Sequence, residues 1–133
     1  MFVARTPVPR LVLIADDHDA TRETLADIME AKGYQVTETE DGQAALDVLS
    51  TSPVDVLVLD LAMPRVDGME LLRRINPPPP LVIIYSAFEH YTSDEVQSLV
   101  GSKVFRSLKK PAAPTRLVSA VADAIEELDR LDE

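Results

Sequence analysis

Five strand-like segments alternate with five helix-like segments along nearly the whole chain, and this alternation constrains the fold more than any other feature. Segments 11–15, 54–59 and 81–85 are short and mostly apolar, which is typical of strands buried on both faces of a sheet. Segments 34–39 and 103–108 complete the predicted strands. Because a helical segment follows each strand, we expect parallel strands in one sheet with helices on both faces.

The helical segments carry apolar residues three and four positions apart, together with residues that begin or end helices. Asp41 and Pro114 stand where helices begin, whereas Gly33 and the prolines after Asn76 end two of them. The predicted helices cover 19–32, the residues from Asp41 to Ser52, those around Met69 to Ile75, 89–100 and 114–130.

The chain has 133 residues, no cysteine and a formal net charge of −10. This length suits one domain, which we predict over 11–130, with an N-terminal extension over 1–10 and an acidic tail over 131–133. Without cysteine there is no disulfide framework, cysteine-ligated zinc site or thiol nucleophile. The negative charge disfavours direct binding to nucleic acid. No segment resembles a membrane span or a signal peptide, so we expect a cytoplasmic protein.

Polar residues stand at the carboxyl ends of four predicted strands. After the first, third, fourth and fifth strands the chain has, in order, Asp16 and Asp17, Asp60, Ser86, and Lys109 and Lys110. Ligands of open parallel sheets bind beyond the carboxyl ends of the strands, where the strand order reverses. If the order is 2-1-3-4-5, the first and third strands are neighbours and the three aspartates share one pocket.

Carboxylates packed into one pocket repel each other, and a bound divalent cation would remove that cost. Oxygen ligands alone favour Mg²⁺, or Mn²⁺, over zinc. A carboxylate can act as a nucleophile that forms an acyl phosphate, and phosphoryl transfer depends on positioning and on neutralised charge. A metal, a lysine ammonium and a hydroxyl donor at one sheet edge would meet those needs.

These motifs resemble the receiver domain of bacterial response regulators over about residues 11–130. The matching pieces are Ala15-Asp16-Asp17, Leu59-Asp60-Leu61-Ala62-Met63-Pro64 with Asp67-Gly68, Ser86-Ala87, and Lys110-Pro111. Each piece alone is common, but four in this order at the ends of predicted strands form a specific signal. The resemblance implies an α/β, flavodoxin-like (βα)5 fold, a three-layer sandwich whose five-stranded parallel sheet has the order 2-1-3-4-5.

The resemblance also implies roles for the acidic residues. By this resemblance, Asp60 is expected to be the phosphoacceptor. Asp17 and Asp60 are expected to bind Mg²⁺ directly, together with the backbone carbonyl of Ala62, and Asp16 to help hold the ion through water.

Ser86 and Lys110 are implied to contact the phosphoryl group, with a cis bond between Lys110 and Pro111. We expect Lys110 rather than Lys109 in the pocket, because the lysine of the family directly precedes the proline. Alternation along a strand would turn the two lysine side chains in opposite directions, so only one of them can enter the pocket.

Two stretches depart from the family pattern. Ser107 stands where the family usually has an aromatic residue, and Phe105 is expected to face the same side of the strand. Residues 88–91 make an unusual start to the fourth helix. We expect His18 to be exposed at the rim of the pocket and His90 to lie on the surface.

The resulting hypothesis is a phosphorylation-dependent signalling switch and not an enzyme. A histidine kinase or phosphotransfer protein would phosphorylate Asp60, and the face of the fourth helix, fifth strand and fifth helix would contact a target protein or a second copy of the chain. One alternative is a receiver-like interaction module that works without phosphorylation. Another is a haloacid-dehalogenase-like phosphatase, which is disfavoured because such enzymes need an aspartate where this chain has Ala62.

Overall fold

Within residues 9–77, 79–88 and 90–132, which the computed structural model describes, five parallel strands form one sheet in the order β2-β1-β3-β4-β5. The strands are β1 (Leu11–Ala15), β2 (Gln35–Thr39), β3 (Val56–Leu59), β4 (Leu81–Ser86) and β5 (Arg106–Lys109). The helices that connect and follow them are α1 (Asp19–Ala31), α2 (Gly42–Thr51), α3 (Gly68–Arg74), α4 (Ser93–Gln97) and α5 (Pro114–Leu131). The order and the parallel pairing confirm the predicted flavodoxin-like fold.

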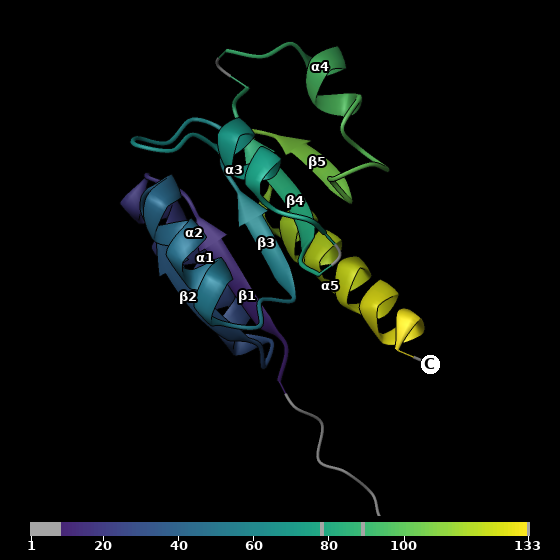
Figure 1. Cartoon of the computed structure of the whole chain (residues 1–133). Coiled ribbons are helices and arrows are strands. Elements are labelled where there is room, and N and C mark those ends of the chain that lie inside the picture. The colour runs from purple at the N-terminus through teal and green to yellow at the C-terminus, as the bar shows by residue number, and fades with distance from the viewer. Residues whose placement is uncertain (1–8, 78, 89, 133) are drawn as a thin grey trace, which may run out of the picture.

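Helices cover both faces of the sheet and make it the middle of three layers (Figure 1). Side chains of α1 and α5 pack on one face, and those of α2, α3 and α4 pack on the other. Neighbouring residues of a strand alternate between these two apolar clusters, as Val12 and Leu13 do in β1 and Val56 and Leu57 do in β3. All four side chains are fully buried. Burial of each such side chain stabilises the fold by about 1.5–3 kcal/mol relative to exposure.

The central strands place the carboxyl ends of β1 and β3 next to each other. Strand β1 lies between β2 and β3, and Ala15 is the partner of Leu59 at the last paired position. The next residues along the two strands are Asp16 and Asp60. The register of the sheet therefore brings two residues that are far apart in sequence to one edge.

The region between β4 and β5 differs most from the sequence-based prediction. Helix α4 is shorter than the predicted 89–100, and residue 89, the predicted start, lies outside the described residues. The helix begins after Thr92 because its hydroxyl accepts from the Glu95 N–H while the Glu95 carboxylate accepts from the Thr92 N–H. Beyond α4 the chain turns through Gly101, whose φ of +91° is readily adopted only by glycine.

Strand β5 begins at Arg106 and not at residue 103 as predicted. Phe105 therefore lies outside the strand and packs into the α1–α5 cluster. Ser107 pairs with Ile84, which belongs to the cluster on the opposite face. The prediction that Phe105 and Ser107 face the same side is wrong, because strict alternation holds only within a regular strand. The other strand boundaries agree with the prediction to within two residues.

Arg10 joins the first strand to the end of the last helix. Its guanidinium donates to the carboxylates of Asp55, Asp129 and Asp132. The predicted extension and acidic tail thus contribute Arg10 and Asp132 to a contact with the domain. In the part of the chain that the structure describes, no helix combines the length and the apolar character needed to cross a membrane.

Replacement of Gly42 by alanine is expected to destabilise the fold, because α2 begins against the loop that follows β3. A Cβ at this position would lie 1.6 Å from the Val66 carbonyl oxygen, so the backbone has to move. We expect Gly42→Ala to lower the free energy of unfolding by about 1–3 kcal/mol, measured by urea denaturation. Gln43→Ala, at the exposed next position, is the control and should change it by less than about 0.5 kcal/mol. Equal stability of the two variants would contradict the packing described here.

Candidate functional site

Two buried aspartates extend the central strands by one residue each. The Asp16 N–H donates to the Thr39 carbonyl (3.1 Å), and the Asp60 N–H donates to the Ala15 carbonyl (2.9 Å). The backbone ladder therefore holds both residues in place at the edge of the sheet. Each aspartate is only 3% exposed. Buried carboxylates are costly unless they are hydrogen-bonded and paired, so their partners determine the character of the site.

Asp60 has partners on both carboxylate oxygens. Its Oδ1 accepts from the Ser86 hydroxyl (2.8 Å) and from the Ala62 N–H (3.1 Å). Its Oδ2 lies 3.3 Å from the Lys110 ammonium. Residues at or just after the ends of β3, β4 and β5 thus meet at one carboxylate, as we expected from the positions of the predicted strand ends.

Lys110 lies between the two buried aspartates. Its Nζ is 2.7 Å from Asp16 Oδ2 and 5.2 Å from the centre of the Tyr85 ring. The Tyr85 hydroxyl in turn donates to the Ala112 carbonyl and so holds the chain just after the cis Lys110–Pro111 bond. Burial lowers the pKa of Lys110, but the Asp16 hydrogen bond and the negative charges of Asp16 and Asp60 outweigh burial and raise the pKa above its usual value. The ammonium therefore remains charged at neutral pH.

Lys109 lies outside this group. Its side chain is exposed, and its Nζ lies 5.8 Å from the centre of the Phe88 ring. Lys109 is the last residue of β5 and Lys110 the first beyond it, and their side chains have different neighbours. Of the two, the structure brings only Lys110 into contact with the aspartates.

Phe88 contacts Ser86 of the site. In the sequence, residues 88–91 stand out only as a departure from the family pattern, which does not predict this contact. Its N–H donates to the Ser86 hydroxyl (3.3 Å), and Ser86 itself is fully buried. Phe88 is 8% exposed and has a φ of +60°, a left-handed conformation that is unusual for a bulky residue. No residue pattern predicts this conformation, since it depends on how the chain leaves β4.

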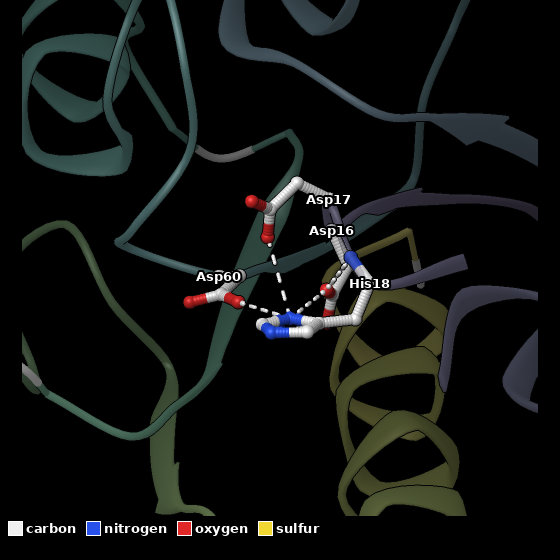
Figure 2. Close-up of side chains that lie close together, drawn as sticks. All are labelled: Asp16, Asp17, His18 and Asp60. Carbon is white, nitrogen blue, oxygen red and sulfur yellow. Dashed lines mark hydrogen bonds and ion pairs between the residues drawn. The ribbon is translucent and has the colours of Figure 1, made fainter. Parts of the chain in front are cut away.

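Asp17 and His18 complete one side of the pocket (Figure 2). The Asp17 side chain is 36% exposed, and that of His18 is 62% exposed. The His18 Nδ1 nevertheless lies 3.2 Å from Asp16 Oδ1, 3.3 Å from Asp17 Oδ1 and 3.7 Å from Asp60 Oδ2. His18 is thus exposed at the rim, as expected, but it also faces the acidic cluster. His90 is exposed on the surface.

The pocket has the donor set of a cation site. One oxygen from each of Asp16, Asp17 and Asp60, together with a ring nitrogen of His18, lie within 4.8 Å of one another. Lys110 offsets only part of the negative charge of three carboxylates. The Ala62 backbone is also adjacent, since its N–H binds Asp60. Hard oxygen ligands such as these carboxylates suit Mg²⁺.

Known proteins match this chain over most of its length. A family model described as the response regulator receiver domain matches residues 12–122. Response regulator GtcR of Aneurinibacillus migulanus is 30% identical over 84% of this chain and 46% of its own length. Sensor histidine kinase RcsC of Salmonella typhi is 31% identical over 84% of this chain and 12% of its own length. The chain therefore spans less than half the length of these curated relatives.

Solved structures agree with the match. The receiver domain of the Francisella response regulator 1452 has a TM-score of 0.77 and 31% identity, and the alignment covers 90% of this chain and 98% of that one. A response regulator receiver domain protein from Clostridium thermocellum has a TM-score of 0.80 and 25% identity, with coverage of 92% and 98%. The family match, the strand order and the aspartates at the ends of β1 and β3 lead to one conclusion, that this chain belongs to the receiver domains of response regulators.

Proposed function

We propose that the chain accepts a phosphoryl group on Asp60 from a histidine kinase or a phosphotransfer protein, in a reaction that requires Mg²⁺. The observation that carries this proposal is the buried Asp60 carboxylate, which has the Ser86 hydroxyl and the Lys110 ammonium on its two oxygens. We place this exchange in the cytoplasm. The chain acts as a phosphoacceptor and not as an enzyme that turns over a separate substrate.

In the proposed reaction, a carboxylate oxygen of Asp60 attacks the phosphorus of a phosphohistidine. The new P–O bond forms as the P–N bond breaks, and the histidine nitrogen leaves with the electron pair. Because Lys110 already lies within 3.3 Å of Asp60, its ammonium is placed to pair with the phosphoryl oxygens. The Ser86 hydroxyl can turn from the carboxylate to donate to the same group.

The acidic residues that would hold the ion are Asp17 and Asp60, with the Ala62 carbonyl, and Asp16 would act through water. When bound, Mg²⁺ or Mn²⁺ neutralises negative charge between the acceptor carboxylate and the incoming phosphoryl group. Asp16 has a further task, because it also holds Lys110 beside Asp60.

Phosphorylation would be read through Ser86. If its hydroxyl moves to the phosphoryl group, the hydrogen bond from the Phe88 N–H to that oxygen is disturbed. Phe88 leads into α4, so the change would reach the face of α4, β5 and α5, where we place the contact with a target protein or a second copy of the chain.

A second candidate is an interaction module that works without phosphorylation. The observation that favours it is Ser107, a residue without the ring that usually responds to the phosphoryl group in this family. The labelling experiments that follow separate the two functions.

Asp60→Asn is expected to abolish phosphorylation, because an amide oxygen is too weak a nucleophile to form an acyl phosphate. The wild type and the variant are incubated with Mg²⁺ and a small acyl-phosphate donor, and mass spectrometry detects the added phosphoryl group. Asp27→Asn, at an exposed position of α1, is the matched control and should be labelled as the wild type is. An unlabelled wild type, or an Asp60→Asn variant labelled as fully as the wild type, would refute the proposed function.

Lys110→Gln is expected to slow labelling of Asp60 by about 100-fold, because one preorganised charge on the reacting oxygens is lost. Lys109→Gln removes the same charge from the next residue and should stay within about threefold of the wild type, since Lys109 lies outside the pocket. Initial rates with the same donor make the comparison. The assignment of Lys110 fails if the two variants slow the reaction equally.

A further inference from the structure

We propose that His18 is a metal-selectivity residue, whose Nδ1 joins the aspartates as a ligand for divalent transition ions. The inference rests on the cation site of the proposed function and deepens it. Its prediction is that the pocket binds ions such as Co²⁺ or Zn²⁺ through nitrogen and oxygen, whereas Mg²⁺ uses the oxygens alone.

The spacing of the four donor atoms supports this proposal. Ligand atoms about 2.1 Å from one ion are about 3.0 Å apart in an octahedral site and about 3.4 Å apart in a tetrahedral one. His18 Nδ1 lies 3.2 Å and 3.3 Å from the carboxylate oxygens of Asp16 and Asp17, and 3.7 Å from Asp60 Oδ2. All four donor atoms lie within 4.8 Å of one another, so side-chain movements can bring the ring nitrogen and these oxygens to a single ion (Figure 2).

The backbone holds His18 in this position. Its N–H donates to Asp16 Oδ1 (2.9 Å), which ties the residue to the buried carboxylate. His18 is also the N-cap residue of α1, but its side chain makes no capping hydrogen bond to the helix. The ring instead points at the aspartates and remains exposed enough to exchange contacts with an ion.

The chemistry of the donor atoms predicts which ions His18 should favour. Mg²⁺ prefers hard oxygen ligands and gains little from an imidazole. Affinity for nitrogen-containing sites rises from Mn²⁺ to Co²⁺ and beyond along the first transition series. His18 is therefore expected to change the ratio of affinities for Co²⁺ and Mg²⁺ more than the affinity for Mg²⁺ itself.

The test compares Co²⁺ and Mg²⁺ binding by the full chain in the wild type, His18→Ala and His90→Ala, by calorimetry. We expect His18→Ala to lose Co²⁺ affinity by about 10-fold or more and to change Mg²⁺ affinity by less than about threefold. His90→Ala, which removes the other histidine of the chain at an exposed position, should match the wild type for both ions. The Co²⁺ absorption bands of the wild type should also change in His18→Ala, because a nitrogen ligand is lost.

A second readout uses the nitrogen NMR signals of the imidazole rings, of which the chain has two. Added Zn²⁺ should shift the His18 Nδ1 signal and leave His90 unchanged.

If His18→Ala keeps the Co²⁺ affinity of the wild type, the proposal is overturned. It is also overturned if the variant binds both ions more tightly, as it would if the ring were a positive charge competing with the metal. A wild type that is labelled on Asp60 with Mg²⁺ but fails these tests overturns the role of His18 alone. A wild type that binds neither ion overturns the cation site as well.

Discussion

The pairing of Lys110 with Asp16 and Asp60 is the interaction on which the rest of the site depends. Both carboxylates are 3% exposed, and such groups are not tolerated at the edge of an apolar sheet without a partner. Lys110 partly neutralises them, and Ser86 and Ala62 satisfy the remaining oxygen of Asp60. The arrangement leaves an excess of negative charge in the pocket. That excess favours a bound cation, which the proposed transfer of a phosphoryl group to Asp60 requires.

The parallel sheet brings the paired residues together. The candidate site residues stand at or just after the carboxyl ends of β1, β3, β4 and β5, and parallel strands bring these ends to one edge. The buried partners of β1 and β3, ending at Ala15 and Leu59, keep the two acidic residues in register. The apolar layers on both faces contribute indirectly, because they bury β1 and β3 up to Ala15 and Leu59, the residues before the two aspartates.

The region between β4 and β5 is built less regularly than the pocket. Between β4 and β5 the chain has a short α4, a left-handed Phe88 and a strand that begins only at Arg106. Ser107 lacks the aromatic ring that the family usually has at this position. Phe88, however, contacts the Ser86 hydroxyl directly through its N–H. An aromatic residue that contacts Ser86 thus comes from the segment just after β4, and Lys109 of β5 lies over its ring.

The sequence by itself determined the five βα units, because buried parallel strands appear as apolar runs whose ends can be located. The resemblance supplied the strand order. The strand ends and that order together predicted the convergence of Asp16, Asp60, Ser86 and Lys110. The resemblance also separated Lys110 from Lys109, because the lysine of the family directly precedes a proline, as Lys110 precedes Pro111. Tertiary structure alone decided the true start of β5, the side taken by Phe105, the conformation of Phe88 and the approach of His18 to three carboxylates. These features depend on distances between segments that no periodicity encodes, and each is set by packing and hydrogen bonds that form only when the strands assemble.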